Sequence, residues 1–379
     1  MLPHLESEDP GNMNNRKSLL HRCFGLLLLV IATGVHAGQD DGPYARYTVQ
    51  GLEVKWLCDG KVVRKDFAQP TNVRLEPECA TSRPVTVREV DNVFPAAVKF
   101  QATKLAAISD IHGQFGNMKR LLQAHGIIDQ ELNWSFGDGH LVVTGDVLDR
   151  GEQVTEALWL LYELDVQAKA AGGALHLLLG NHEAMVMAND LRYVNPKYLA
   201  VARELGLGYS DLFDSTSVLG RWLRTKPVIV QVNDSLFMHA GLHPDYMNLK
   251  LSFKEVNEHF RRSLGLSKAD IKQDDILTFL YGKLGPIWYR GYFMAPLLEP
   301  AELDQLLQQM HVARIVVGHT TMSGVLSHYR GKVISIDADL RGGEIGEVLL
   351  IQDGKLSRGT LSGERLPVPE FSGNASAFK

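Results

Sequence analysis

The sequence predicts an α/β fold preceded by a smaller β-rich extension. From Lys104 onward, short apolar runs alternate with segments whose apolar residues recur at helical spacing. Residues 38–100 instead show apolar residues alternating with polar ones between turn signals, which is typical of strands. Because strands that alternate with helices pack as a sheet covered by helices, the second part of the chain is expected to be the main domain.

The length and composition are those of a globular protein. The 379 residues suit one large domain or two unequal ones, and 45% of them are hydrophobic, which is enough for an ordinary core. The net charge of -5 differs from the basic footprint of a nucleic-acid-binding protein, so no nucleic-acid partner is expected. The apolar runs are too short for a membrane span, and a monomer is the default expectation.

The N-terminus has the order of a secretory signal peptide. A basic stretch ends at Arg22, an apolar run covers residues 24–35, and small residues up to Ala37 follow where a signal peptidase cuts. We therefore expect residues 1–37 to be a signal peptide and the protein to be periplasmic or secreted. A buried N-terminal helix is the alternative. Met13 offers a second start, directly before the basic stretch.

The β-rich extension, residues 38–100, contains two cysteines, Cys58 and Cys79. In an oxidising compartment such a pair is expected to form a disulfide, and two separate buried thiols are the alternative. Cys58 also precedes Arg64 by the spacing found in cysteine-dependent phosphatases. That mechanism is disfavoured because a disulfide would remove the nucleophile and no helix follows to lower the pKa of the thiol.

The main domain is expected at residues 101–361. Phe115, Met118 and Leu122 fall on one helix face and Gly126 follows as a helix stop, a pattern that recurs further along. The expected helices are 115–122, 154–164, 253–264 and 300–310, with a mostly helical cap at about 189–226. The expected strands are 105–108, 141–144, 175–179, 228–232, 236–238, 315–317, 332–336, 346–352 and 355–358. The Gly-, Pro- and Ser-rich residues 362–379 are expected to be a flexible tail.

Five short stretches place residues of metal-binding type directly after predicted strands. They are Ser109-Asp-Ile-His-Gly113, Gly145-Asp-Val-Leu-Asp-Arg-Gly151, Gly180-Asn-His-Glu183, Met238-His-Ala-Gly241 and Gly318-His-Thr320. Asp110, Asp146 and Asn181 follow one another at the length of one βαβ crossover. Each crossover returns the chain to the same sheet edge, where sites of α/β proteins form, so these side chains are expected to converge.

The residue types in these stretches point to a metal site. Asp, Asn and His offer oxygen and nitrogen ligands suited to Mn, Fe or Zn, and a thiolate site is excluded because no cysteine is among them. A single Asp or His would be read as surface charge or a helix cap. Five stretches in this order, all after strands, have no comparably simple structural explanation.

The five stretches resemble the calcineurin-like metallophosphoesterases, and among them the phosphoprotein-phosphatase branch. That branch carries Gly-Asp-x-His-Gly, Gly-Asp-x-x-Asp-Arg-Gly and Gly-Asn-His-Glu. This chain differs at Ser109, where the motif has glycine, and at Ala240, where His-Gly-Gly is usual. The run 224–242 and Trp288-Tyr-Arg-Gly291 resemble the Shewanella-like protein phosphatases. The resemblance covers residues 104–359 and implies a metallophosphoesterase β-sandwich flanked by helices.

The resemblance also implies a centre of two divalent metal ions. The first ion is assigned to Asp110 and His112, and Asp146 is assigned to both ions. The second ion is assigned to Asn181, His239 and His319. Two adjacent cations lower the pKa of a bridging hydroxide and stabilise the charge of the reacting phosphate. Manganese is the favoured metal, with iron and zinc as alternatives.

The same resemblance assigns the catalytic and phosphate-binding residues. His182 would protonate the leaving oxygen as general acid, and Asp149 would orient it and favour its protonated form. Arg150, Asn181 and Arg290 are the candidates for binding phosphate, although a surface ion pair is the alternative for Arg290. Supporting roles are assigned to Glu183, His243 and Arg341, and a contact to His319 is expected from Asp337 or Asp339.

The sequence therefore predicts an exported phosphomonoesterase that acts on a phosphorylated protein or peptide. Phosphotyrosine is implied by the subfamily resemblance. A small-molecule phosphatase or dinucleoside-polyphosphate hydrolase on the same metal site is the alternative. A third reading is a binding module that keeps the fold without activity, and the complete set of predicted ligands argues against it.

Overall fold

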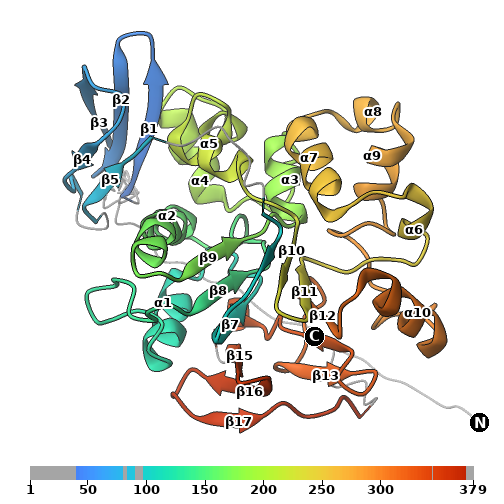
Figure 1. Cartoon of the computed structure of the whole chain (residues 1–379). Coiled ribbons are helices and arrows are strands. Elements are labelled where there is room, and N and C mark those ends of the chain that lie inside the picture. The colour runs from blue at the N-terminus through green and yellow to red at the C-terminus, as the bar shows by residue number, and fades with distance from the viewer. Residues whose placement is uncertain (1–39, 80–82, 90–96, 344, 373–379) are drawn as a thin grey trace, which may run out of the picture. The chain divides into compact units, whose positions relative to one another are not determined.

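Two six-stranded sheets form the framework of the protein (Figure 1). The structure is a computed structural model that describes residues 40–79, 83–89, 97–343 and 345–372. The expected signal peptide, residues 1–37, lies outside the described residues. Within the described part of the chain, no helix is both long and apolar enough to cross a membrane.

The first sheet contains three parallel strands joined by crossover helices. β7, β8 and β9 are parallel neighbours, and the helices α1 (Phe115–Ala124) and α2 (Val154–Ala170) connect them as the alternating pattern predicted. β15 pairs with β7 in the antiparallel direction and extends the sheet. In sheet order the strands are β17 (Arg365–Pro367), β16 (Lys355–Thr360), β15 (Glu347–Gln352), β7 (Lys104–Ile108), β8 (His140–Val143) and β9 (Ala174–Leu177).

The second sheet is also mixed. β11, β12 and β14 run parallel, β13 is antiparallel to β14, and β10 is antiparallel to β11 but parallel to β6. In sheet order its strands are β13 (Leu326–His328), β14 (Val333–Ser335), β12 (Arg314–Val317), β11 (Ser235–Met238), β10 (Ile229–Val232) and β6 (Lys99–Phe100). β6 comes from the expected extension, yet it pairs with β10, so residues 99–100 belong to the main sheet framework.

The two sheets pack face to face as a sandwich. Successive residues of β7 alternate between two apolar clusters, because side chains of a strand point to opposite faces. Leu105 and Ala107 join a cluster with Phe237 of the second sheet, whereas Ala106 and Ile108 join the cluster that includes α1 and α2. This arrangement confirms the predicted α/β sandwich flanked by helices, and it fixes which strand ends lie side by side.

Further helices surround one end of the framework. The segment predicted as a helical cap contains α4 (Pro196–Glu204), η1 (Tyr209–Phe213) and α5 (Val218–Arg224). A short helix that the sequence did not predict, α3 (Asn181–Met187), directly follows β9 and Gly180. The remaining helices are α6 (Tyr246–Leu249), α7 (Phe253–Ser263), α8 (Lys268–Ile271), α9 (Asp275–Leu280), α10 (Pro300–Met310) and η2 (Leu340–Gly342).

The N-terminal extension packs on helices α2 and α5. The antiparallel strands β1 (Asp41–Thr48), β2 (Gly51–Cys58) and β3 (Lys61–Phe67) form one sheet, and β4 (Val73–Leu75) pairs with β5 (Val85–Val87). β1 contacts α2 and α5, and Trp159 Nε1 of α2 donates to the carbonyl of Pro43 at 2.9 Å. α2 is therefore covered on both sides, which explains why ten of its residues are buried.

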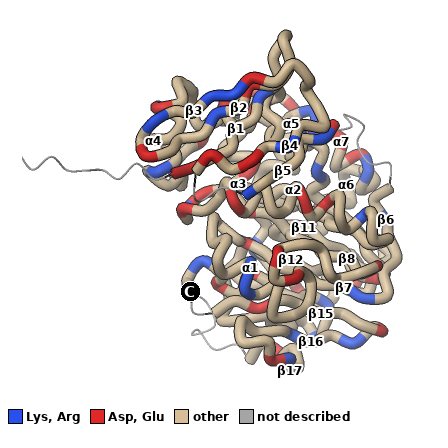
Figure 2. Tube along the Cα trace, turned by 90° about the vertical axis from the view of Figure 1, so that its left-hand side faces the viewer, with Lys and Arg blue, Asp and Glu red and all other residues tan. Residues whose placement is uncertain are grey.

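The structure shows how the two cysteines, the outer strands of the extension and the C-terminal segment are arranged. Cys58 and Cys79 form a disulfide, so Cys58 is not a free thiol nucleophile. Charges of both signs alternate on the outer strands: Figure 2 shows Lys and Arg beside Asp and Glu there, and Arg64 lies 3.0 Å from Glu53. The expectation of a flexible tail from residue 362 was wrong for β17, which pairs with β16.

Candidate active site

The five motif stretches meet at the carboxyl ends of the strands. Those of β7, β8 and β9 carry the first three stretches, and β11 and β12, which are parallel neighbours in the other sheet, carry the last two. All six predicted metal ligands lie in this region and are buried, with between 0% and 7% of their surface exposed. The convergence expected from the crossover spacing is therefore present in the structure.

The backbone at these strand ends adopts an unusual conformation. Six non-glycine site residues have φ between 47° and 70°, in the left-handed region: Asp110, His112, Asp146, Asp149, Arg150 and His319. Non-glycine residues seldom adopt this region, and such strain gathers at functional sites. A second constraint is close packing, because a Cβ at Gly318 would collide with Ser109 Oγ. Ser109, which replaces the usual glycine, uses that space to donate a hydrogen bond to Asp110 Oδ2.

Asp110, His112 and Asp146 form the first cluster of candidate ligands. His112 Nε2 lies 3.8 Å from Asp110 Oδ1 and 3.7 Å from Asp146 Oδ2. His112 Nδ1 donates to the carbonyl of Leu148 at 2.9 Å, and Arg150 Nε donates to His112 Nε2 at 3.3 Å. Nε2 therefore carries the lone pair, which accepts from Arg150 here and is the atom that would bind a metal ion. These three residues would together hold one divalent cation.

Asn181, His239 and His319 form the second cluster together with Asp146. His239 Nδ1 donates to the carbonyl of Thr144 at 2.9 Å, so its Nε2 carries the lone pair. Asn181 Oδ1 lies 2.8 Å from this nitrogen, His319 Nδ1 lies 3.1 Å from it, and Asp146 Oδ2 lies 3.3 Å from it. Two oxygen atoms thus approach a nitrogen lone pair, a contact that a proton or a metal cation between them makes favourable.

The pKa values of the clustered residues also fit a site for metal ions. Burial acts to lower the pKa of His239, but the neighbouring carboxylates, above all Asp146, raise it to about 9. Burial also opposes ionisation of Asp146, yet His239 and His182 hold the pKa of that carboxyl well below its usual range. Protons and metals compete for such ligands, so a proton on His239 occupies the place that a cation would take. The donor set fits two divalent ions that share Asp146.

His182 and Asp149 form a hydrogen-bonded pair at the edge of the first cluster. His182 Nδ1 donates to Asp149 Oδ2 at 2.6 Å. Burial acts to lower the pKa of His182, but Asp146 and Asp149 outweigh it and raise the pKa. His182 Nε2 lies 3.7 Å from Asp146 Oδ2, as far as His112 Nε2 does, so distance alone also allows a metal-ligand role. The bond to Asp149 favours the protonated ring and hence a general acid.

Glu183 holds the loop that carries Asp146. Its carboxylate is fully buried and accepts four backbone N–H groups, those of Gly180 at 2.8 Å, Asp146 at 2.9 Å, Val147 at 2.8 Å and Leu148 at 3.1 Å. Four donors on one carboxylate compensate for its removal from water. The supporting role assigned to this residue is thus a specific one, namely to fix the turn after β8.

All residues of the two clusters except His239 line a cleft of about 220 Å³. Arg150 and Asn181 line it, and so does Arg290, whose Nη1 donates to the carbonyl of His319 and to Thr320 Oγ1, both at 3.0 Å. Arg290 is therefore held toward the site and does not form the surface ion pair that was its alternative. Several further residues line the cleft wall although the sequence did not single them out individually: Tyr193, Trp288, Met294, Thr320 and Thr321.

The residues given supporting roles occupy different places around the site. Asp337 accepts from Thr321 Oγ1 at 2.7 Å rather than contacting His319, whose buried Nε2 has no hydrogen-bond partner among the described residues. His243 lies 3.2 Å from Asp245 and does not line the cleft. Arg341, in contrast, does line it. Asp337 and His243 lie in loops after strands and Arg341 lies in the short helix η2, and local sequence does not fix the side-chain direction at such places.

A comparison of families identifies the class of this site. Calcineurin-like phosphoesterase sequences match residues 103–322, more than half of the chain. The chain belongs to the calcineurin-like phosphoesterases. The matched residues contain every candidate ligand described above, as well as His182 and Asp149. This phosphoesterase is therefore a hydrolase of phosphoric esters, and its paired Asp and His clusters fit the two-metal centre of its family.

Similar proteins come from distant organisms. A cold-active protein-tyrosine phosphatase from a psychrophilic Shewanella species is 39% identical to the phosphoesterase, with a TM-score of 0.82 over 86% of this chain and 98% of that one. An uncharacterized protein from Schizosaccharomyces pombe is 32% identical and covers 68% of this chain and 81% of its own length. Shewanella-like protein phosphatase 1 from Plasmodium berghei is 29% identical, over 57% of this chain and 61% of its own length.

Proposed function

We propose that this phosphoesterase is a protein phosphatase that prefers phosphotyrosine. The Tyr193 ring lies 5.1 Å from the His182 ring, inside the cleft, and this is the main support for the proposal. A phenolic leaving group that takes a proton from His182 would lie against Tyr193, where aromatic rings attract each other. The description of the similar Shewanella structure as a tyrosine phosphatase supports the proposal, and so does the name of the Plasmodium relative.

Substrate binding would begin with the phosphate. Two divalent cations held by the assigned ligands would supply Lewis acidity that polarises the phosphate and activates a water. The Arg150 guanidinium stacks on Tyr193 at 5.1 Å, and Arg290 is held by its two hydrogen bonds. Planar guanidinium groups can bind two phosphate oxygens at once, so the arginines would orient the ester for in-line attack.

Departure of the leaving group would depend on His182. Asp149 accepts a hydrogen bond from His182 Nδ1, so the other ring proton, on Nε2, is directed into the cleft. Transfer of that proton to the ester oxygen neutralises the alkoxide or phenoxide as the P–O bond breaks. The neutral ring then remains oriented by Asp149 until it takes up a proton from solvent. Asp149 therefore acts through His182 and is a positioning residue.

The substrate class can be tested directly. We would compare kcat/KM for a phosphotyrosine peptide, a phosphoserine peptide of the same sequence, and diadenosine tetraphosphate. We expect the phosphotyrosine peptide to be the best substrate. A clear preference for the dinucleotide would replace this proposal with the small-molecule alternative, and equal rates on both peptides would remove the tyrosine preference.

The role of Tyr193 has its own test. Tyr193→Ala is expected to lower kcat/KM for the phosphotyrosine peptide by about 10-fold, since an aromatic pair contributes up to about 1.5 kcal/mol. The phosphoserine peptide should be affected less. Leu199→Ala, which removes another exposed apolar side chain, is the matched control and should change neither rate. Equal losses on both peptides in Tyr193→Ala would contradict an aromatic contact to the substrate.

We also propose that the two metal ions are manganese. The oxygen-rich first cluster supports this choice, although iron and zinc accept the same ligands. The metal-free enzyme would be titrated with each ion while aryl phosphate hydrolysis is followed. We expect manganese to restore the highest rate at two ions per chain. Higher activity with zinc or iron would replace the assignment and leave the site itself intact.

We propose further that the enzyme works in the periplasm or is secreted. The supporting observations are the order of charges and apolar residues in 1–37 and the disulfide between Cys58 and Cys79. Residues 1–37 would be fused to a reporter phosphatase that is active only after export. Activity of the fusion, and its loss when the apolar run 24–35 is interrupted by charges, is expected. An inactive fusion retained in the cytoplasm would reject export.

A further inference from the structure

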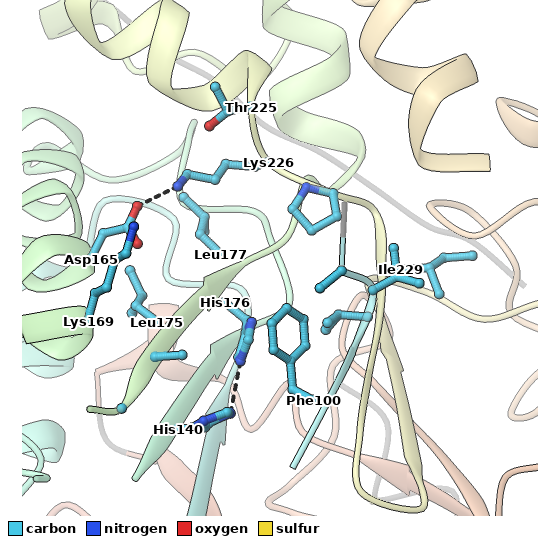
Figure 3. Close-up of a pocket in the computed structure, with 16 residues that line it drawn as sticks. Phe100, His140, Asp165, Lys169, Leu175, His176, Leu177, Thr225, Lys226 and Ile229 are labelled. Carbon is cyan, nitrogen blue, oxygen red and sulfur yellow. Dashed lines mark hydrogen bonds and ion pairs between the residues drawn. The ribbon is translucent and has the colours of Figure 1, made fainter. Parts of the chain in front are cut away.

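A second cavity, of about 400 Å³, lies along β9 and beside the first residue of β8 (Figure 3). It opens between β9 and β6, the edge strands of the two sheets. It shares no lining residue with the active-site cleft. Cavities of this size hold small molecules, and most of its lining is apolar, with a few polar groups at defined places.

Two histidines form the polar part of the cavity floor. His140 of β8 and His176 of β9 are hydrogen-bonded, with His140 Nδ1 and His176 Nε2 3.1 Å apart, and Figure 3 shows them beside Phe100. The Phe100 ring lies 4.5 Å from the His176 ring. Burial lowers the pKa of both histidines, that of His176 to about 3, so the pair is uncharged at neutral pH.

The uncharged pair has a fixed hydrogen-bonding capacity. One proton lies between the two rings, and each ring has one outer nitrogen. Whichever ring donates, one outer nitrogen is left as a donor and the other as an acceptor. Both histidines line the cavity, and among the described residues the only hydrogen bond of either ring is the one between them, which leaves the outer nitrogens for a ligand. A hydroxyl group can bond to either nitrogen, whereas a carboxylate can bond only to the donor.

The mouth of the cavity carries positive charge. Lys226 Nζ lies 2.5 Å from Asp165 Oδ2, which also accepts from Trp222 Nε1 at 2.9 Å. This ion pair balances the charge of Asp165, and the exposed Lys169 adds one positive charge beside it. Figure 3 shows these side chains together, away from the histidine pair. An anionic group would be attracted to this end of the cavity.

We propose that this cavity binds a small phenolic carboxylate. The aromatic ring would lie among Leu175, Leu177 and Ile229, the ring hydroxyl would bond to the histidine pair, and the carboxylate would face Lys169. The three parts of the cavity match the three parts of this ligand class: an uncharged polar floor, an apolar wall and a basic mouth. The site is independent of the phosphatase reaction and of its metal ligands.

Calorimetric titration of the purified enzyme would test the ligand class. The probe is 3-(4-hydroxyphenyl)propionate, and saturable binding with a Kd of about 1 mM or below is expected. 3-Phenylpropionate lacks the hydroxyl, and tyramine carries an amine in place of the carboxylate. Each should bind about 10-fold more weakly or worse, because each leaves one polar contact unmade. Failure of the probe to saturate, or equal binding of 3-phenylpropionate, would overturn the proposal.

Variants would then locate the bound probe. His176→Phe keeps a ring but removes both nitrogens and should weaken binding by about 10-fold, as Lys169→Ala should to a smaller degree. Lys272→Ala, an exposed lysine of another helix end, is the matched control. Asp146→Asn should retain binding, and loss of binding there would place the probe in the active site and reject the proposal. Should His176→Phe fail to fold, the ligand series on the unchanged enzyme decides alone.

Discussion

Strands β8 and β9 have opposite chemistry at their two ends. His176, the third of the four residues of β9, lines the apolar cavity, and six residues later His182 lies in the active site. Both side chains are buried, with 8% and 3% of their surface exposed. Burial followed by the neighbouring His140 lowers the pKa of His176 to about 3, whereas Asp146 and Asp149 overcome burial and raise that of His182. The partner, not the burial, decides which histidine carries a proton.

The backbone differs between the two ends as well. The cavity histidines lie within regular strands, in register with neighbouring strands. The active-site residues lie just past the strands, where Asp146 and Asp149 have φ of 55° and 70°. Left-handed conformations cost free energy, and here the surrounding hydrogen bonds of Glu183 maintain them. The active-site residues thus adopt backbone conformations that their residue types disfavour, whereas the cavity histidines adopt ordinary strand conformations.

Among the changes at the active site, Asp146→Asn is expected to have the largest effect on activity. It keeps the shape of the side chain but removes the charge that both clusters share. We expect turnover to fall by about 10⁴-fold or more, because the Lewis acidity of both ions contributes several kcal/mol. Metal content, measured by elemental analysis, should fall with it. A variant that retained both metal and activity would show that Asp146 is not the shared ligand.

His182→Asn is expected to have the next largest effect. Loss of a general acid lowers turnover by about 10²–10⁴-fold. Metal content should stay unchanged, which matters because His182 Nε2 lies as near to Asp146 as His112 Nε2 does. A loss of one metal ion per chain in this variant would instead make His182 a ligand. Substrates with better leaving groups should be affected less, since they need less protonation.

Asp149→Asn should lower the pKa of His182 toward the low pKa of the cavity histidine, His176. Without the carboxylate the pKa of His182 falls, because one of the groups that raise it is lost. His182 must be protonated to act, so activity is lost as pH rises through its pKa, and this alkaline limit should move to lower pH. We expect turnover at neutral pH to fall by about 10–100-fold. An unchanged alkaline limit in the pH–rate profile would contradict the role of Asp149.

The sequence predicted the reactive end of these strands better than the other end. The ligands could be found because each follows an apolar run and is flanked by glycines, at crossover spacing. His140 and His176 have the same spacing as Asp110 and Asp146, thirty-six residues. His140 comes directly before an apolar run and His176 lies inside one, whereas the ligands follow such runs, so the sequence did not single out either histidine. Only the pairing of β8 with β9 brings them together.

Other features depended on contacts that are distant in sequence. β6 and β17 form because their partners β10 and β16 offer free edges, and neither segment has a strong strand pattern of its own. The cleft wall comes from loops, so Tyr193 and Thr321 carried no recognisable signal. Trp288 belonged to a recognised stretch, yet its place beside His319, with ring centroids 5.5 Å apart, required the structure.

The smallest expected effect is on stability in acid, and it concerns the cavity end. His176 has an unfolded pKa near its usual value of 6.5 and a folded pKa of about 3. Above pH 6.5 both states are uncharged, and as pH falls from 6.5 toward 3 the unfolded state binds the proton first, so stability is lost. Between pH 6.5 and 5 this group should cost about 2 kcal/mol.

His176→Phe should remove that part of the acid sensitivity. Urea unfolding at pH 7, 6 and 5 would measure it, with Lys169→Ala as the control that alters the same cavity but keeps the histidine. The free energy of unfolding should fall less steeply with pH in His176→Phe than in the wild type and the control. Parallel curves would mean that His176 takes up a proton in the folded state at ordinary pH. His176 and His182 would then differ less in protonation than their neighbouring groups imply.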